Sequence, residues 1–266
     1  MRNDMSRSLV VKNKEKVKEA NILAVVFDFD DTLVCPPIEW QQVMAEFFVD
    51  NINENYVSIV KREEQVARYK KYIANNAGLT LTKYMVKLQQ LIQKKRRYGV
   101  RTVVYYREKF DELWRSETVN YYTPKDLVMG VRSLLLQLMK NGIKIFVVTG
   151  GDRAHKVNLI KKLNLEKIIR SENIFGDYDE RFPHGFSKKS ALQHIRDEVA
   201  KKNALNIRSE KSIICMIGDG KSDMQAAQKV GNVLAVGFHQ KQYADMYIMG
   251  KGYPVNALVK ILVKRN

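Results

Sequence analysis

Residues 22–33 read ILAVVFDFDDTL, an apolar run that ends in three aspartates and a threonine. A short Ile/Val/Phe stretch without polar alternation is typical of a strand that is buried on both faces of a parallel sheet. Ligands of such sheets bind outside the carboxyl ends of the strands, which is where Asp28 and Asp30 stand. The stretch therefore predicts a parallel α/β fold with a site at this edge.

Asp28 and Asp30 lie two residues apart, so in extended chain both carboxylates face the same side. Like charges in one crevice repel unless a cation or a proton compensates them, and a divalent metal is the natural compensation. Asp and Thr at strand ends also serve as helix caps or turn formers, and that interpretation stays open for the motif alone.

An EF-hand loop is a second alternative, because acidic or hydroxyl residues fall at loop positions 1, 3, 5 and 12: Asp28, Asp30, Thr32 and Glu39. It fails on two details. Leu33 occupies the position that requires glycine, and a strand rather than a helix precedes the loop.

The composition is that of a globular protein, with 266 residues of which 45% are hydrophobic. No apolar stretch approaches the length of about eighteen residues that spans a bilayer, and we expect neither a membrane span nor a secretory signal. With only Cys35 and Cys215, the chain has no disulfide framework. We therefore expect a cytoplasmic protein that does not engage a membrane, and the sequence indicates no oligomeric state.

The chain carries 46 basic and 29 acidic residues, a net charge of +17 that invites a polyanionic partner such as nucleic acid. The charge is spread, however. Residues 36–124 hold 15 basic and 10 acidic residues, a net of +5, which leaves +12 for the rest. A generally basic, solvated surface is the default interpretation, and nucleic acid is possible but not favoured.

From about residue 126 onward, helical and strand patterns alternate. We expect helices at 131–141, 152–163 and 188–202 and another from Asp223, with strands at 143–148, near Ile168 and Ile169, at 213–217 and at 233–236. Such a βα series predicts a Rossmann-like, doubly wound parallel sheet.

Residues 38–122 break this rhythm, because they are long and helical and contain no buried-strand run. The segment begins after Pro36 and Pro37 and ends near Pro124. We therefore predict an α-helical cap at 38–122, inserted into a catalytic core of residues 1–37 and 123–266.

Four strand ends of the expected sheet carry polar groups: Asp28 with Asp30; Thr149; Lys188 or Lys189 at the start of a helix; and Asp219 with Asp223 in the segment IICMIGDGKSDM. Gly218 and Gly220 allow a tight turn that brings the last two acids to one point. Each signal is weak alone, but together they lie on successive strands of one sheet.

With these segments in view, the sequence resembles the haloacid dehalogenase-like (HAD) superfamily. VVFDFDDTLV, VVTGG, a lysine in GFSKKSAL and IGDGKSD resemble its four motifs, and the inserted helices resemble the cap of the phosphoglycolate phosphatase-like branch. Lys188 fits the third motif better than Lys189, which stays as the alternative.

The resemblance implies that Asp28 is the nucleophile and that Asp30 is the general acid and base. It implies that Mg²⁺ is held by Asp28, the backbone carbonyl of Asp30 and Asp219, with Asp223 in support, and that phosphoryl oxygens are held by Thr149, Gly150 and Lys188. These groups suit phosphoryl transfer, in which charge spreads over the equatorial oxygens.

We therefore expect a Mg²⁺-dependent phosphatase that hydrolyses a small phosphorylated metabolite through an aspartyl-phosphate. A phosphomutase is one alternative. A nucleic-acid-binding protein, or a nucleic-acid-end phosphatase that uses the basic cap, is another, since basic and aromatic residues interleave at 94–115, from the run KKRRYGVR to Tyr105, Tyr106, Arg107, Trp114 and Arg115.

Overall fold

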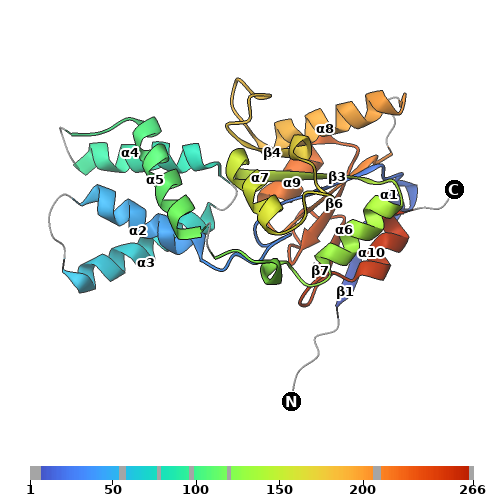
Figure 1. Cartoon of the computed structure of the whole chain (residues 1–266), viewed down its shortest axis with the longest axis horizontal. Helices are drawn as coiled ribbons and strands as arrows, with labels where there is room; N and C mark the ends of the chain where they lie inside the picture. Colours follow the sequence, from blue (N-terminus) through green and yellow to red (C-terminus); the bar gives the residue numbers. More distant parts are fainter. Residues whose placement is uncertain are drawn as a thin grey trace, which may run out of the picture. The chain divides into compact units, whose positions relative to one another are not determined.

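The computed structural model describes residues 7–53, 58–76, 79–95, 99–118, 121–205 and 211–263 (Figure 1). The chain divides into two compact units. Residues 1–35 and 123–266 form one of them, called here the core unit, and residues 36–122 form the other, the helical unit. The second unit is thus inserted into the first.

The core unit is built on a seven-stranded sheet with the order β1-β7-β6-β5-β2-β3-β4. Neighbouring strands are parallel except for β1, which runs antiparallel to β7. The strands are β1 (Ser8–Val11), β2 (Ala24–Phe27), β3 (Lys144–Asp152), β4 (Ile174–Asp177), β5 (Ile214–Gly218), β6 (Val233–Phe238) and β7 (Met246–Met249).

Strand β2 lies at the centre of the parallel part, between β5 and β3. After β2 the chain builds outward to β3 and β4, and it then crosses to the other side of β2 to form β5 and β6. The strand order therefore reverses at β2, and such a reversal is where open α/β sheets bind their ligands.

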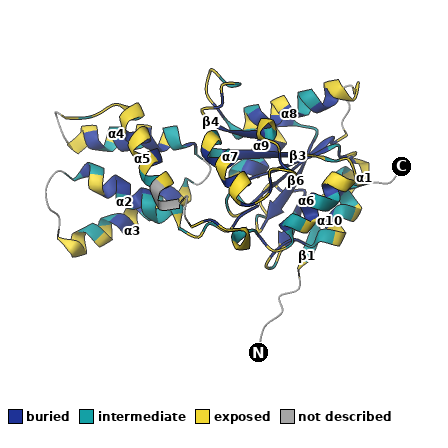
Figure 2. Cartoon of the chain, in the orientation of Figure 1, coloured by how far each residue is buried: buried dark blue, intermediate teal, exposed yellow. Residues whose placement is uncertain are grey.

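Helices flank the strands of this sheet, and β2, β4, β5 and β6 are buried at every residue (Figure 2). One apolar cluster joins β2, β3, β5 and β6 to α8 (Lys188–Lys202) and α9 (Lys221–Val230). The remaining helices are α1 (Lys14–Glu19), α6 (Val131–Lys140), α7 (Arg153–Lys162) and α10 (Val255–Leu262), of which α7 contacts β3 and β4.

The two ends of the insertion meet in the core unit. After β2, a tight turn brings Val34 into a β-bridge with Leu127, and the backbone N–H of Cys35 donates to the carbonyl of Asp126 at 2.7 Å. A capping box between Thr123 and Asp126 starts the short 3₁₀ helix η1 (Pro124–Asp126). The two segments at which the chain leaves and re-enters the core unit are therefore bonded to each other within that unit.

The helical unit consists of α2 (Trp40–Ile52), α3 (Ile59–Asn75), α4 (Leu81–Lys95) and α5 (Val103–Thr118). It has its own apolar core, with residues such as Phe48, Ile73, Leu88 and Phe110. The sequence pattern at 38–122 had predicted this all-helical character.

Of the residues on which the nucleic-acid alternative rests, Tyr105 and Arg115 are exposed, whereas Tyr106 and Arg107 are buried. Tyr106 is 3% exposed and Arg107 is fully buried, where it pairs with Asp111 at 3.3 Å. Neither side chain is on the surface, so neither can stack on a base or contact a phosphate. Arg96, Arg97 and Tyr98 of the basic run lie outside the described residues.

Most elements lie where the sequence pattern placed them, but one expected strand was wrong. Ile168 and Ile169 lie in a turn after α7, and the edge strand β4 begins five residues later, at Ile174. Strands β1 and β7 and helix α10 were not expected at all. Among the described residues, every helix is too short or too polar to cross a bilayer.

A buried tyrosine joins the C-terminal segment to the loop that follows β2. The ring of Tyr253 stacks on Phe238 at 5.0 Å and meets Phe27 edge-on at 6.4 Å, and its hydroxyl donates to the carbonyl of Thr32 at 2.9 Å. The hydrogen bond satisfies a buried carbonyl next to the end of the central strand.

We expect Tyr253→Phe to lower the free energy of unfolding by about 1–2 kcal/mol, because it leaves the carbonyl of Thr32 without this buried donor. Denaturant unfolding measures the change. The matched control is Tyr243→Phe, which removes the hydroxyl of a tyrosine that is 38% exposed and should change stability by less than about 0.5 kcal/mol. Equal stabilities of the two variants would contradict the prediction.

Candidate active site

Three neighbouring strands of the core unit deliver polar side chains to one edge of the sheet. Asp28 directly follows β2, Thr149 lies in the second half of β3, and Asp219 directly follows β5. Because β5, β2 and β3 are parallel neighbours, their carboxyl ends lie together.

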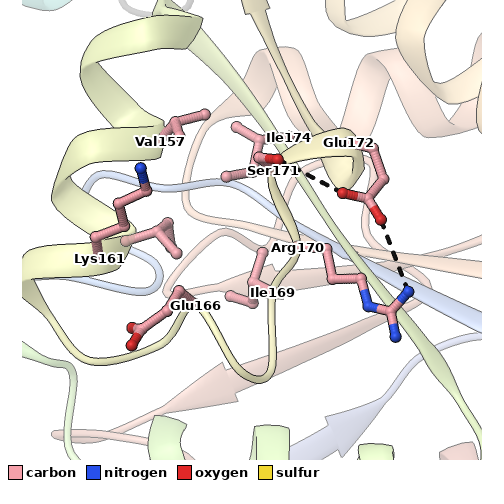
Figure 3. Close-up of a pocket in the computed structure, with 9 residues that line it drawn as sticks. Val157, Lys161, Glu166, Ile169, Arg170, Ser171, Glu172 and Ile174 are labelled. Atoms are coloured by element: carbon pink, nitrogen blue, oxygen red, sulfur yellow. Dashed lines mark hydrogen bonds and ion pairs between the residues drawn. The ribbon is translucent and has the colours of Figure 1, made fainter.

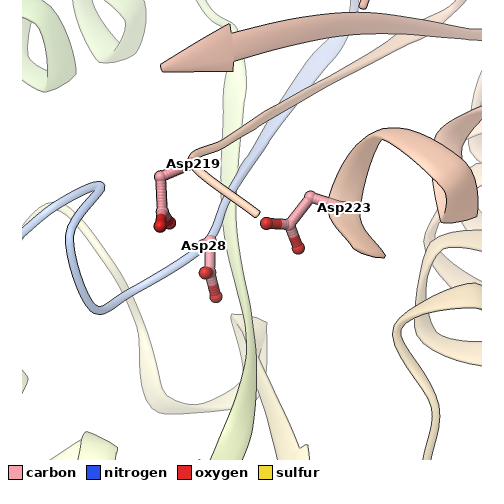
Figure 4. Close-up of side chains that lie close together, drawn as sticks. All are labelled: Asp28, Asp219 and Asp223. Carbon is pink, nitrogen blue, oxygen red and sulfur yellow. The ribbon is translucent and has the colours of Figure 1, made fainter. Parts of the chain in front are cut away.

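Asp28, Asp219 and Asp223 form a cluster in which one carboxylate oxygen of each lies within 4.8 Å of the others (Figure 4). Asp28 is 8% exposed and Asp223 is fully buried. The turn from β5 to α9 brings the last two acids together, as the spacing of four residues had suggested.

Lys188 lies against this cluster. Its Nζ is 2.9 Å from Asp28 and 2.6 Å from Asp223. A capping box at Ser187 begins α8 at Lys188, so the lysine stands in the first turn of that helix. Lys189 is exposed. Of the two lysines that the sequence left open, only Lys188 is part of the site.

Asp219 and Asp223 are oriented by further hydrogen bonds. The hydroxyl of Thr32 donates to the carboxylate of Asp219 at 3.0 Å and lies 3.1 Å from the backbone N–H of Asp219, while Asp223 accepts from the N–H of Gly220 at 3.0 Å. Gly218 makes room for Asp223, since a Cβ on Gly218 would lie 2.5 Å from an oxygen of that carboxylate.

The electrostatics of the cluster are dominated by burial and mutual repulsion. Burial, with Asp223 and Asp30 nearby, raises the pKa of Asp28 to about 7 although Lys188 opposes the rise. Burial and Asp28 raise the pKa of Asp219 to about 6. Burial also raises the pKa of Asp223. For Lys188 burial lowers the pKa, but attraction to Asp223 and Asp28 outweighs it, so the net pKa is raised.

This donor set fits a hard divalent cation. Three carboxylates converge on one point and a single buried lysine contacts two of them, so negative charge is in excess. Mg²⁺ prefers oxygen ligands and is usually held by one or two carboxylates in addition to phosphate and water. The arrangement therefore suits Mg²⁺ together with a phosphate.

Thr149 and Gly150 lie at the same edge but outside the acidic cluster. Thr149 is 1% exposed, and its hydroxyl accepts a hydrogen bond from the N–H of Gly151 at 3.1 Å. The same hydroxyl retains a proton to donate. This end of β3 thus holds a hydroxyl with a proton to donate, which is a donor suited to an anion.

Asp30 stands apart from the cluster. Its two carboxylate oxygens lie 2.9 Å and 2.8 Å from the Nζ of Lys156, a lysine that is only 3% exposed. The sequence analysis missed Lys156. A signal was present, since Lys156 shares the spacing of Leu159, Ile160 and Leu163 on the buried face of α7, where a lysine is unusual.

A pocket of about 250 Å³ lies elsewhere in the core unit, between α7 and residues 166–174 (Figure 3). Arg170 and Glu172 pair on its rim at 3.8 Å. None of the clustered acids, and neither Lys188 nor Lys156, lines it. The pocket is therefore separate from the site.

Comparisons of sequence agree with the motifs. Residues 22–231 match the family described as haloacid dehalogenase-like hydrolase. Phosphoserine phosphatases from Bos taurus and Homo sapiens are each 28% identical over 107 residues, which is 39% of this chain and 46% of theirs. The chain thus aligns with about half the length of these curated relatives.

Comparisons of structure show the same fold at low identity. A β-phosphoglucomutase from Clostridium difficile is 14% identical with a TM-score of 0.59, over 91% of this chain and 97% of that one. A predicted phosphoglycolate phosphatase from Haemophilus somnus 129PT is 16% identical with a TM-score of 0.57, over 82% and 85%. A HAD hydrolase of family IA, variant 3, from Entamoeba histolytica is 19% identical with a TM-score of 0.57, over 91% and 90%.

The crowded carboxylates predict that Asp219→Asn stabilises the metal-free protein. Because the pKa of Asp219 is raised to about 6 in the folded chain, its ionised form costs stability above that pH. We expect a gain of about 1–2 kcal/mol at pH 7.5 in EDTA, which shrinks as the pH falls through 6 toward 4 and Asp219 becomes protonated in the folded protein.

Thermal unfolding in EDTA and in Mg²⁺ measures this effect. The stabilisation by Mg²⁺ should be smaller in Asp219→Asn than in the wild type, because the variant lacks one anionic ligand. Glu166→Gln, at an exposed carboxylate of the same unit, is the matched control and should leave both values unchanged. A variant that is no more stable than the wild type in EDTA would refute the prediction.

Proposed function

Because the chain belongs to the haloacid dehalogenase-like hydrolase family, we propose that it is a Mg²⁺-dependent phosphatase that hydrolyses a small phosphate monoester through an aspartyl-phosphate. The observation that carries the proposal is the cluster of Asp28, Asp219 and Asp223 at the end of the central strand, in which Lys188 contacts Asp28 and Asp223. Carboxylates alone would repel a phosphate, and this set combines a nucleophile with groups that compensate the charge.

Asp28 is the proposed nucleophile. One carboxylate oxygen of Asp28 attacks phosphorus, the bond from phosphorus to the ester oxygen breaks, and the phosphoryl group is left on Asp28. The backbone N–H of Asp28 donates to the carbonyl of Ile217 at 2.9 Å, which ties the nucleophile to the neighbouring strand β5. The attacking group is thus mounted on the rigid sheet rather than on a mobile loop.

Asp30 is the proposed general acid and base. As the ester bond breaks, the protonated carboxyl of Asp30 gives its proton to the leaving oxygen and releases an alcohol. The resulting carboxylate then takes a proton from the water that attacks phosphorus, which frees Asp28 and inorganic phosphate. The sum of the two steps is one water consumed per ester cleaved.

Lys188, Thr149 and Gly150 are the proposed phosphate-binding groups. Lys188 brings a positive charge next to Asp28, where the phosphoryl group would be transferred. The hydroxyl of Thr149 and the main-chain N–H of Gly150 supply neutral donors at the end of β3. Donors fixed before the reaction stabilise the charge that develops on phosphoryl oxygens.

The residues suited to hold Mg²⁺ are the carboxylates of Asp28, Asp219 and Asp223 and the backbone carbonyl of Asp30. When bound, the metal would neutralise charge on both the carboxylates and the phosphate. Thr32 supports this role by orienting Asp219 through its hydroxyl.

We propose that the substrate is a small phosphorylated metabolite and that residues 36–122 select it, since the groups above bind only the phosphate and the leaving oxygen. Support for this class comes from the phosphoserine phosphatases, which align with part of the chain. A phosphomutase is the second candidate, because the β-phosphoglucomutase from Clostridium difficile shares the fold. A phosphatase releases free phosphate, whereas a mutase yields an isomer and little phosphate.

Phosphate release across phosphoserine, phosphoglycolate, sugar phosphates and nucleotides tests the proposal. We expect at least one small monoester to release stoichiometric phosphate, and Asp28→Asn to abolish this release because an amide is not a nucleophile toward phosphorus. Mass spectrometry of the quenched wild type should detect a phosphoryl group that the variant lacks.

Glu166→Gln, at an exposed carboxylate away from the site, controls for the acid-to-amide change and should leave turnover unchanged. Turnover by Asp28→Asn near the wild-type rate would remove Asp28 from the mechanism. An isomerised product without free phosphate would instead favour the mutase.

Metal dependence is a separate prediction. Activity should fall to background in excess EDTA and return with Mg²⁺, while Ca²⁺ should support it poorly. Calcium takes more ligands at longer distances, so it would hold Asp28 away from the geometry needed for attack. Full turnover in EDTA would contradict the metal requirement.

A further inference from the structure

Lys156 is a buried cation for which the proposed steps have no use. It lies in the first turn of α7, is 3% exposed, and forms no ion pair with Asp28, Asp219 or Asp223. Lysine is almost never buried without a partner, and its partner here is Asp30. We propose that Lys156 is the positioning residue that fixes the carboxylate of Asp30 for proton transfer, an inference that rests on the proposed role of Asp30.

The contact has the geometry that such a role requires. The ammonium lies 2.9 Å from one oxygen of Asp30 and 2.8 Å from the other, so it is centred on the carboxylate. Rotation of an aspartate carboxylate about its last torsion is otherwise soft. A cation that holds both oxygens removes this freedom.

The same contact leaves Asp30 able to react. Each carboxylate oxygen has two lone-pair positions, and one ammonium uses only one position on each. The side chain of Asp30 is 30% exposed, whereas that of Lys156 is 3% exposed. The lysine therefore holds the carboxylate from the protein side and leaves its other side open to a leaving oxygen or a water.

Three features of its surroundings hold Lys156 in place. The carboxylate of Asp152 caps α7 by accepting from the N–H of His155 at 2.8 Å, which fixes the turn that carries the lysine. Its Nζ lies 4.4 Å from the centre of the Phe29 ring, a cation–π contact. A Cβ at Gly151 would come within 3.3 Å of its Cε, so this glycine provides the space that the side chain occupies.

The two lysines at the carboxyl edge of the sheet therefore pair with different carboxylates. Lys188 pairs with Asp28 and Asp223, and Lys156 pairs with Asp30. Loss of Lys156 should then affect both steps that depend on Asp30. Activation of the water is the same for every ester, whereas protonation of the leaving oxygen is not. Poor leaving groups need that proton, and good ones need it less.

The experiment compares turnover of 4-nitrophenyl, phenyl and methyl phosphate in Mg²⁺ by the wild type and by Lys156→Met, Lys156→Arg and Asp30→Asn. Methionine keeps the length of the apolar stem but removes the charge. We expect Lys156→Met to lower kcat/KM, which reports transfer of the phosphoryl group to Asp28, about 10–100-fold for methyl phosphate and less than about threefold for 4-nitrophenyl phosphate.

Arginine keeps the charge and a two-donor edge, so Lys156→Arg should restore part of the loss with methyl phosphate. Lys161→Met, which removes an exposed lysine from the same helix, is the matched control and should behave as the wild type. In an Asp30→Asn background, Lys156→Met should change turnover of 4-nitrophenyl phosphate by less than about threefold, because the group that it positions is already absent.

Two results would overturn the inference: an equal loss of kcat/KM for all three esters, which is the mark of a merely structural role or of substrate binding, or no effect. The proposed function is judged separately. If the loss of activity caused by Asp30→Asn does not depend on the leaving group, the acid role of Asp30 fails. If the loss caused by Asp30→Asn depends on the leaving group and the loss caused by Lys156→Met does not, only the inference about Lys156 fails.

Discussion

The constraint on which the site depends is repulsion among carboxylates at the end of the central strand. Asp28, Asp219 and Asp223 offer oxygens within 4.8 Å of one another, and burial raises the pKa of each. The surrounding structure reduces this repulsion with one shared ammonium, one threonine hydroxyl and one main-chain N–H. The fold therefore holds a high density of negative charge in place, an arrangement that fits a bound cation.

Much of the fold could be predicted from the sequence, because its elements carry strong local signals. Strand β2 is an uninterrupted apolar run, and α8 has a capping box at Ser187 that marks its first residue. The strand near Ile168 was wrong because two adjacent isoleucines are too short a signal. The actual strand β4 has the sequence IFGD, in which a glycine and an aspartate replace the apolar pattern. Strand β1 was missed because it is a short edge strand that is only half-buried.

The part of the candidate site that could be predicted consists of residues at or next to strand ends. The positions of Asp28, Thr149 and Asp219 follow from the parallel sheet. The sequence left both Lys188 and Lys189 open, and the structure places Lys188 against the acids. Their chemical roles remain proposals. Lys156 was missed because a lysine in a helix is exposed by default, and its spacing from Leu159 and Ile160 is a weak signal. The tertiary structure shows that α7 turns it inward toward Asp30.

Two carboxylates that lie two residues apart thus occupy different environments. Asp28 is 8% exposed, borders two further acids and shares its lysine with Asp223. The side chain of Asp30 is 30% exposed and has a lysine of its own. Pairs of acids in contrasting surroundings are how a single fold separates two kinds of chemistry. Because Lys188 and Lys156 come from different helices, α8 and α7, each of the two carboxylates takes its cation from a different part of the core unit.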